Sequence, residues 1–398
     1  MSDAALLAAL RPEARNAPGS GIVEVMSYGF GRDGMIPLWA GEGDLPTPEF
    51  IRKAAMDSLA AGETFYTYQG GLPALREAIA AYHGRLYGGT FDPTEFLVTG
   101  SGMQSIKLAL ELVAGAGDDV VIPSPAWPNI TAAVGVFGAR PVEVPMVLGN
   151  AGWKLDLDQL FAACGARAKA IFLNSPCNPT GWTATREELV AILDFARQRG
   201  IWIIADEIYA RFSYGRDRSP SFRDVAVADD RILYVNTFSK NWAMTGWRVG
   251  WLGAPKALAP TIENLIQYST SGVAVFMQRA AIAALDQGEA FIAEQVARAA
   301  TGRDIVCSAL EATGQVRLQR PDGAFYLFFA IDGEPDTRKL GLRLVDEANI
   351  GLAPGTAFGA GGDGYLRLCF ARSADSLSRA TGRLVEWLER RPKGGSGR

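Results

Sequence analysis

The sequence contains one histidine in 398 residues, and this scarcity narrows the chemistry open to the protein. The histidine, His83, lies in a segment typical of the end of a helix with a polar face, so we expect it to be solvated. One histidine disfavours a Ser-His-Asp triad and a zinc site with several histidine ligands, and we expect no metal site. A proton shuttle at neutral pH must then be a carboxylate, a tyrosine or a lysine with a lowered pKa.

Other absences disfavour further classes of protein. No apolar run approaches the ~20 residues that cross a bilayer, and the start of the chain lacks the basic region of a signal peptide. The net charge of −4 offers no basic surface to nucleic acid or to an anionic membrane, so anionic substrates must meet individual arginines. The cysteines form no CxxC pair and predict reduced thiols in a cytoplasmic protein: Cys164, Cys177, Cys307 and Cys369.

Short apolar runs alternate with helical patterns over most of the chain. Several of these runs are continuously apolar, as expected for strands that are covered on both faces. We predict an α/β fold with a mostly parallel sheet of about seven strands. The candidate strands are Phe96–Thr99, Val120–Pro123, Val142–Pro145, Ala170–Asn174, Trp202–Asp206, Leu233–Thr237 and Val249–Gly253. Helical patterns between them cover Met103–Ala114, Leu157–Ala163 and Arg186–Gln198.

Beyond about residue 285 the pattern changes to a smaller α+β layer. A long helix over Gly288–Ala312 precedes short strands and two further helices. Because a chain of this length favours two or more domains, we predict a large domain over residues 46–285 and a small domain over residues 1–45 and 286–398. The tail at residues 393–398 is predicted to be disordered.

Polar residues gather where the predicted strands end, which is where open α/β sheets bind ligands. Asp206 ends an apolar strand, and a buried acid is costly unless it has a partner. With Tyr209 three residues later, a protonated pyridine nitrogen is a fitting partner, because the carboxylate keeps that nitrogen charged. For an isolated aspartate, a helix cap or a salt bridge is the alternative.

A lysine soon after another apolar strand has the features of an attachment point for an anionic aldehyde. Lys240 follows hydroxyls at Thr237 and Ser239 and precedes Arg248, and these three groups suit a phosphate. A nearby cation lowers the pKa of an amine, which favours both nucleophilic attack and proton transfer. The apolar neighbours of Lys240 disfavour the alternative of a solvated lysine.

Three further segments place useful groups near the same strand ends. Ser101 and Gly102 open a helix, where free N–H groups and the helix dipole attract anions, although a plain capped turn is equally consistent. Asn178 lies in a rigid turn, where it either caps the turn or binds a ligand oxygen. Trp127 offers a flat face in a loop held open by prolines, although alone it is typical of a core residue.

Together these segments resemble the class I aminotransferases of the fold-type I enzymes that use pyridoxal 5'-phosphate (PLP). The resemblance extends from Trp39–Asp44 to Tyr365–Leu368, and its most specific parts are the asparagine–proline turn, the Asp-x-x-Tyr strand end and the lysine with its arginine. It implies a PLP-dependent transferase that moves an amino group from an amino acid to a 2-oxo acid by a ping-pong mechanism. It also implies a homodimer whose active sites are shared across the interface.

The resemblance implies roles for individual residues. Lys240 resembles the Schiff-base lysine that shuttles the proton, and Asp206 resembles the partner of the pyridinium nitrogen. Arg367 resembles the arginine that binds the substrate α-carboxylate, with Gly41 beside it. Tyr66 resembles the tyrosine that reaches the phosphate of the partner subunit. Trp127 resembles the aromatic residue that stacks on the cofactor ring. Tyr209 and Asn178 resemble the pair that hydrogen-bonds the ring oxygen, and Asn178 also lies beside the substrate. The residues that correspond to the phosphate cup are Ser101, Gly102, Met103, Thr237, Ser239 and Arg248.

The substrate preference rests on fewer observations. The segment Glu263–Gln278 resembles a loop that the partner subunit contributes, and it contains no arginine or lysine. We therefore favour neutral or aromatic amino acids as donors, with 2-oxoglutarate or pyruvate as acceptor. The candidates to line an apolar or aromatic pocket, each of which is equally consistent with a core position, are Tyr28, Trp39, Trp127 and Phe358. Gly43–Leu45 stands where relatives have a Pro-Asp-Phe-like run, a departure that bears on the substrate entrance.

Two other functions compete with transamination. A PLP lyase on the same scaffold, such as a C–S β-lyase or an enzyme like aminocyclopropane-carboxylate synthase, would have a nearly identical cofactor site. A transcription regulator with an aminotransferase-like domain is the non-enzymatic alternative. The net charge is wrong for DNA, and the family pattern begins within the first ~40 residues, which leaves no room for a helix-turn-helix module ahead of it.

Overall fold

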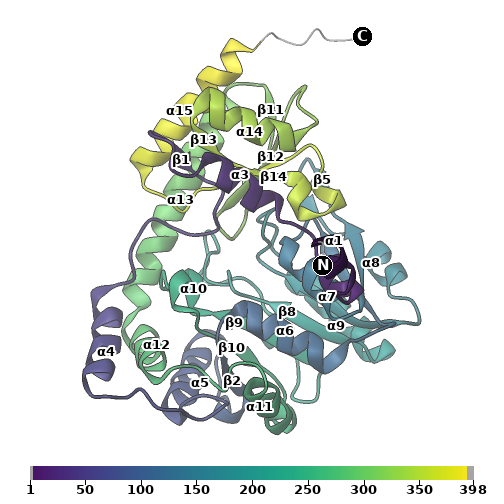
Figure 1. Ribbon diagram of the computed structural model, residues 1–398, viewed down its shortest axis with the longest axis vertical. Coiled ribbons are helices and arrows are strands. Elements are labelled where there is room, and N and C mark those ends of the chain that lie inside the picture. Colours follow the sequence, from purple (N-terminus) through teal and green to yellow (C-terminus); the bar gives the residue numbers. More distant parts are fainter. Residues whose placement is uncertain (1–2, 392–398) are drawn as a thin grey trace.

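The computed structural model describes residues 3–391, so the tail predicted at residues 393–398 lies outside them. Its central layer is a seven-stranded sheet in which only β10 runs antiparallel to its neighbours (Figure 1). In spatial order the strands are β2 (Phe96–Thr99), β10 (Gly250–Gly253), β9 (Ile232–Thr237), β8 (Trp202–Asp206), β7 (Ala168–Asn174), β3 (Asp119–Ser124) and β4 (Arg140–Pro145). The predicted mostly parallel sheet is confirmed, and its predicted strand ends differ from the observed ones by two residues at most.

Helices cover both faces of this sheet, because successive residues of a strand point to opposite faces. In β8, Ile203 packs in the cluster that holds α8 and α9, whereas Ile204 packs in the cluster that holds α6, α7 and α11. Three more helices, α4, α5 and α12, pack around the end of the sheet at β2 and β10. The bounds are α4 (Glu49–Ala60), α5 (Pro73–Tyr87), α6 (Gly102–Val113), α7 (Pro128–Val136), α8 (Leu157–Ala163), α9 (Arg186–Arg199), α11 (Ala259–Gln267) and α12 (Val275–Gln287).

A smaller layer is built on a four-stranded antiparallel sheet, at the top of Figure 1. Its strands, in spatial order, are β11 (Val316–Arg317), β12 (Tyr326–Ile331), β15 (Leu366–Cys369) and β14 (Ala353–Pro354). Its helices are α13 (Glu289–Glu311), α14 (Thr337–Ala348) and α15 (Ala374–Arg390). An early strand, β1 (Ile36–Pro37), pairs in parallel with β13 (Ile350–Gly351) in this layer. The domain boundaries given above stay a prediction.

Several short elements connect the layers. The hairpin of β5 (Val147–Gly149) and β6 (Gly152–Lys154) follows β4, and the single-turn helix α10 (Phe238–Asn241) follows β9. The 3-10 helices are Pro93–Glu95, Phe222–Asp224, Thr245–Trp247, Lys256–Leu258, Gly355–Phe358 and Ala360–Gly362.

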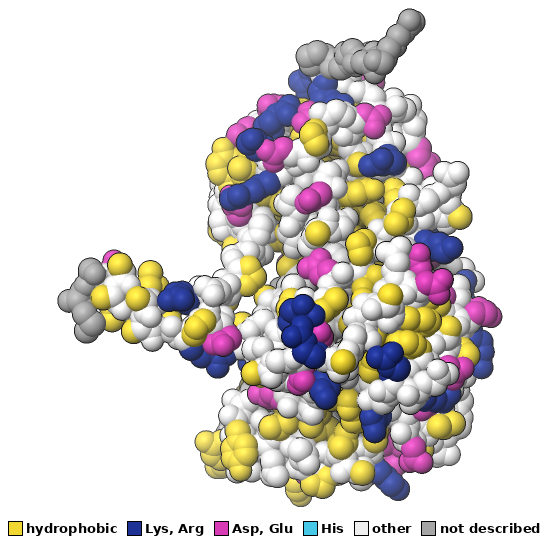
Figure 2. Space-filling view, turned by 90° about the vertical axis from the view of Figure 1, so that its right-hand side faces the viewer, with side chains coloured by type: hydrophobic (Ala, Val, Ile, Leu, Met, Phe, Trp, Pro, Cys, Tyr) yellow, Lys and Arg dark blue, Asp and Glu magenta, His cyan; other side chains and the backbone are white. Residues whose placement is uncertain are grey.

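The first two helices lie at the surface. α1 (Asp3–Ala8) and α2 (Pro12–Arg15) contain no buried residue, and Figure 2 shows the start of the chain projecting at the left. α2 contacts α7, and Arg11 donates a hydrogen bond to the Val136 carbonyl oxygen at the end of that helix. α3 (Gly21–Gly29) packs more deeply, with Val25 against Trp39 and Val345 of α14. This packing holds α3 beside the cavity described below.

The prediction of a solvated histidine is wrong. His83 is 1% exposed, because α5 turns this side chain inward against aromatic residues around β2 and β10. Its ring stacks on Phe96 with 4.7 Å between centroids, and its Nε2 atom accepts a hydrogen bond from Trp251 Nε1 at 3.2 Å. Burial lowers the pKa of the imidazole well below its ordinary value, so His83 serves the core as a neutral ring.

Residues 3–391 contain neither a candidate membrane-spanning helix nor a candidate metal-binding cluster. No helix there has both the length and the apolar character needed to cross a membrane. Nor do three or more His, Cys, Asp or Glu side chains gather there as a metal site would require. The four cysteines are buried and form no disulfide with one another.

Candidate active site

A cavity of about 350 Å³ opens between the two layers, at the carboxyl ends of the parallel strands. It brings together most of the residues that the sequence singled out: Gly41, Gly102, Met103, Trp127, Asn178, Asp206, Tyr209, Thr237, Ser239, Lys240, Arg248 and Arg367. Ser101 does not line the cavity itself but directly precedes Gly102, as the buried N-cap of α6. Tyr66 does not line the cavity and is 94% exposed.

Lys240 extends from the single turn of α10 into this cavity. The turn begins at once after β9, because the Thr237 hydroxyl caps it by accepting a hydrogen bond from the Ser239 N–H. The lysine Nζ atom donates a hydrogen bond to the carbonyl oxygen of Gly41 at 2.7 Å. Burial lowers the pKa of Lys240 to about 8, so a substantial fraction of this amine is neutral near physiological pH.

Asp206 is a buried acid with little compensation from the chain. Its Oδ1 atom accepts one long hydrogen bond, from the Ile208 N–H at 3.4 Å, and the described part of the chain gives the carboxylate no ion pair. Burial raises its pKa to about 7, although Lys240 opposes that rise. A protonated ring nitrogen in the cavity would compensate this charge, so the residues fit the pyridinium of PLP.

Two tyrosines meet beside this acid. The hydroxyl groups of Tyr209 and Tyr326 lie 2.7 Å apart, and burial raises the pKa of Tyr209 well above its ordinary value. Tyr326, on β12, was missed in the sequence. The signal was weak, because only the pairing of β12 with β15 brings this tyrosine to the strand that carries Arg367.

Arg367 is a buried cation without an acidic partner in the described chain. Its Nη1 atom donates to Asn178 Oδ1 at 3.0 Å, and its Nη2 atom donates to the carbonyl oxygen of Trp39. The guanidinium lies 4.5 Å from the centroid of the Tyr326 ring, and its Nε atom has no hydrogen bond. An uncompensated buried guanidinium that faces a cavity is suited to a carboxylate ligand.

The N-terminus of α6 and the turn after β9 form a polar wall whose groups are suited to an anion. The Ser101 hydroxyl accepts from the Gln104 N–H at 3.1 Å, and the Thr237 and Ser239 hydroxyls lie 2.9 Å apart. Arg248 has a left-handed backbone (φ 54°) and donates to the Thr245 carbonyl oxygen at 2.7 Å. Its guanidinium forms no ion pair within residues 3–391, which fits a phosphate group at this wall.

One glycine makes this wall possible. A Cβ atom at Gly250 would lie 2.7 Å from the Asn236 carbonyl oxygen and 2.9 Å from the Gly102 nitrogen. β10 therefore approaches the start of α6 only because position 250 lacks a side chain.

The remaining wall is apolar and comes largely from α3. Ile22, Val23 and Met26 line the cavity together with Trp39. Of the four aromatic candidates, Trp39 and Trp127 line the cavity, whereas the other two do not. Tyr28 is half-exposed and hydrogen-bonds Asp346, because it lies on the outer face of α3. Phe358 is buried in the core behind Arg367, 4.9 Å from its guanidinium.

Comparison with known proteins gives a consistent family. Residues 33–384 match the family model described as aminotransferase class I and II. A probable aspartate/prephenate aminotransferase of Aquifex aeolicus is 35% identical, with 89% of this chain and 91% of that protein covered. An aromatic-amino-acid aminotransferase of Thermococcus litoralis is 33% identical, with 90% and 93% covered. The crystal structure of an aspartate aminotransferase from Thermotoga maritima superposes with a TM-score of 0.89 at 32% identity, covering 96% of this chain and 100% of the other.

Proposed function

Because this chain belongs to the class I and II aminotransferase family, we propose that it transfers the amino group of a neutral or aromatic amino acid to a 2-oxo acid. PLP-dependent transamination follows from the family, with the fold-type I architecture described above. The relatives quoted above carry aminotransferase names, which gives the lyase alternative less support. The proposal extends beyond the family in three respects: the class of amino-group donor, the roles of individual residues and the homodimer.

The residues assigned to the cofactor match the groups that PLP presents. Lys240 would bind it covalently, Asp206 would hold the proton on its ring nitrogen, and the wall of Ser101, Thr237 and Arg248 would bind its phosphate. When bound, the cofactor supplies an electron sink for the pair released when the substrate Cα–H bond breaks. The carboxylate of Asp206 sustains that sink because its charge favours the protonated ring.

Lys240 would move the proton of the reaction. With its pKa lowered to about 8, the amine would accept the proton released from the substrate Cα, hold it at Nζ and release it again within the same site. Arg367 would hold the α-carboxylate by two parallel hydrogen bonds, and this fixes which Cα bond stands perpendicular to the ring. Tyr209 and Asn178 would hydrogen-bond the ring oxygen of the cofactor, as the family resemblance implies.

The donor preference rests on one observation: the wall opposite the anion sites carries no free cation. The cations that line the cavity are Lys240, Arg248 and Arg367, and each has another role above. Ile22, Val23 and Met26 face the space left for the donor side chain. A second carboxylate would lose its hydration there without gaining an ion pair.

A half-reaction screen tests this preference. We expect neutral and aromatic amino acids to remove the visible absorption of the lysine-bound cofactor fastest, with aspartate at least about tenfold slower in kcat/KM, equivalent to about 1.4 kcal/mol. Aspartate as the fastest donor would contradict the proposal on the donor. Persistence of the absorption with all twenty amino acids, or release of ammonia, would favour a lyase instead.

Arg367→Lys tests the carboxylate site. We expect kcat/KM to fall by about a hundredfold or more for every donor, because one ammonium cannot reproduce two parallel hydrogen bonds and leaves Asn178 unpaired. The PLP absorption and the melting temperature report on the cofactor site and on the fold. Unchanged kcat/KM would remove Arg367 from the proposed site.

The homodimer would place Tyr66 in the partner's cavity. Tyr66 and its chain neighbours Phe65 and Tyr68 are all solvent-exposed, and a run of exposed aromatic side chains is typical of an interaction surface. The predicted outcome is complementation: a mixture of Lys240→Ala and Tyr66→Ala chains, reassociated after mild denaturation, regains activity that neither variant has. In that mixture one site combines an intact Lys240 with an intact partner Tyr66. Failure to regain activity in a verified heterodimer would show that Tyr66 does not act across subunits.

A further inference from the structure

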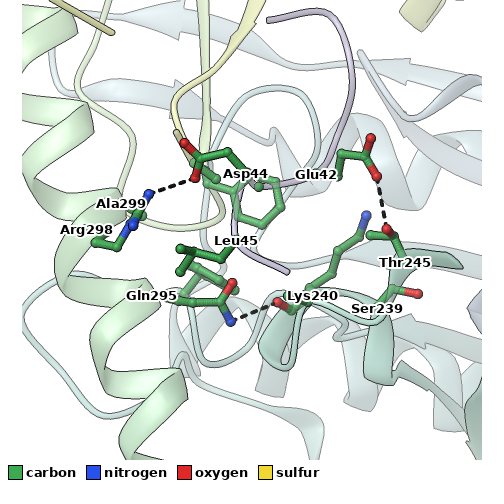
Figure 3. A pocket seen from close by; sticks show the side chains of 14 residues that line it. Glu42, Asp44, Leu45, Ser239, Lys240, Thr245, Gln295, Arg298 and Ala299 are labelled. Carbon is green, nitrogen blue, oxygen red and sulfur yellow. Dashed lines mark hydrogen bonds and ion pairs between the residues drawn. The ribbon is translucent and has the colours of Figure 1, made fainter. Parts of the chain in front are cut away.

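A second, smaller pocket lies behind Lys240, separate from the cavity that would hold the cofactor (Figure 3). It has a volume of about 40 Å³, which exceeds the roughly 10–15 Å³ that a buried water requires. Half of its lining residues are polar, and Glu42, Ser239, Thr245 and Gln295 are among those that share it with the lysine. We call it the rear pocket, and its size and polarity suit ordered water.

Two carboxylates line the rear pocket, and they differ in their hydrogen bonds. Asp44 is fully engaged, because its Oδ1 accepts from Arg298 at 2.7 Å and its Oδ2 accepts from the Ser373 N–H at 2.6 Å. The Glu42 side chain accepts one hydrogen bond within the described chain, from the Thr245 hydroxyl to Oε2 at 2.9 Å. Glu42 therefore retains an oxygen that can take up a proton.

Glu42 and Lys240 lie close together at this pocket. The lysine Nζ atom donates to the carbonyl of Gly41, the residue directly before Glu42. Figure 3 shows the amine end of Lys240 directed toward the pair of Glu42 and Thr245. Burial is the main influence on the pKa of Lys240 and lowers it, whereas the Cys369 thiol and, to a smaller extent, the charge of Glu42 act in the opposite direction. The two groups are therefore coupled electrostatically.

The rear pocket adjoins the surface at Glu42. The segment 42–45 and Thr245 also line an open hollow of about 650 Å³ on the outside of the molecule. Since Glu42 borders both spaces, a proton can pass from the rear pocket to solvent while substrate fills the cavity on the other side of Lys240.

We propose that Glu42 exchanges protons between Lys240 and solvent through the rear pocket. The inference rests on the proposed function, in which Lys240 carries the proton of the reaction. In the exchange, an N–H bond of the Lys240 ammonium breaks and its proton passes to a pocket water, which gives another of its protons to a Glu42 oxygen. An ammonium and a carboxylate become an amine and a carboxylic acid, and release of the Glu42 proton to solvent completes the step.

The first test follows deuterium from a donor labelled at Cα. In the wild-type enzyme, label held by Lys240 is diluted by exchange with solvent before delivery to the cofactor carbon. In Glu42→Gln this exchange is blocked, so we expect the deuterium retained in the cofactor's amine form to rise severalfold. Glu42→Asp should restore part of the exchange and lower the retained deuterium again.

Asp44→Asn is the matched control. It removes a carboxylate from the same pocket, but one whose oxygens are already occupied, so label retention should stay at the wild-type level. Equal retention in Glu42→Gln and the wild type, or equal rises in Glu42→Gln and Asp44→Asn, would overturn the proposal.

A second test needs no cofactor and separates this inference from the proposed function. The pH dependence of Lys240 acetylation by acetic anhydride, read by mass spectrometry in the cofactor-free protein, gives the pKa of the lysine. Glu42→Gln should lower that pKa by about one unit, because a facing negative charge is lost. The other groups near Glu42 are common to both proteins: the Asp44–Arg298 pair, the Cys369 thiol and the Tyr326 hydroxyl. An unchanged pKa would overturn the coupling, whereas a cofactor found on another lysine would overturn only the function assigned to Lys240.

Discussion

Lys240→Ala should lower the turnover number by at least about 10⁴-fold, because it removes both the covalent attachment of PLP and the base that moves the Cα proton. The buried amine ends in a cavity, so its removal leaves the core intact and the melting temperature of the cofactor-free protein should change little. Mass spectrometry after borohydride reduction of the PLP-loaded protein should find the cofactor on Lys240 in the wild type and on no residue in the variant.

Lys53→Ala provides the matched control, because Lys53 is an exposed lysine whose one ion pair is with Asp57 on the same helix. It should retain wild-type turnover and cofactor linkage. Multiple turnovers by Lys240→Ala, or a cofactor found on a different lysine, would refute the role assigned here.

Asp206→Asn should have the second-largest effect and lower kcat by about a thousandfold. Without the carboxylate the ring nitrogen of the cofactor loses its charged partner in a buried site, and the transition state loses roughly 4 kcal/mol of stabilisation. The amide keeps the shape of the carboxylate but cannot hold a proton on the ring nitrogen by charge. The cofactor phosphate is bound at a different wall, so PLP should still bind, and equilibrium dialysis measures its affinity. A kcat within tenfold of the wild type would contradict this role.

The same substitution should stabilise the cofactor-free protein, and increasingly so as pH rises. The folded-state pKa of Asp206 is raised to about 7, above its ordinary value of 3.8, so the folded state binds more protons than the unfolded state between these values. The free energy of unfolding therefore falls as pH rises through this window. At pH 8 the variant, which has no charge to bury, should melt about 4 °C higher than the wild type.

At pH 5 the difference should be less than half of that at pH 8, because only ionisation of the unfolded wild type still opposes folding, and it should vanish below about pH 3.8. Glu207, whose pKa burial also raises to about 7, is present in both proteins and cancels in the comparison. Equal melting temperatures at pH 8 would show that the Asp206 carboxylate is better compensated in solution than its single hydrogen bond indicates.

The sequence located the strands well because each one is short, continuously apolar and bounded by polar turns. Strand β8 was predicted at its observed bounds, and Asp206 with it, since an acid at the end of such a run stands out. His83 was misjudged for the opposite reason. Its neighbours along the chain, Tyr82, Gly84 and Arg85, do not mark a core position, and only packing against Phe96 and Trp251 reveals that it faces the core.

Which residues from separate elements meet at the cavity depends on tertiary contacts, and local sequence patterns do not encode these contacts. Tyr326 reaches Tyr209 only through the register of β12 against β15. The apolar side-chain wall arises because α3 packs against α14, which turns Ile22 inward and Tyr28 outward on one short helix. Periodicity alone did not distinguish these two faces, because both carry apolar residues.

What the sequence determined by itself was therefore the α/β architecture and the residues at the strand ends, because parallel strands place their carboxyl ends at one edge of the sheet in any such fold. Only the tertiary structure decided how the two layers enclose that edge. Burial between them lowers the pKa of Lys240 and raises that of Asp206, and neither shift is written in the local sequence, since desolvation depends on every segment that excludes water from the site.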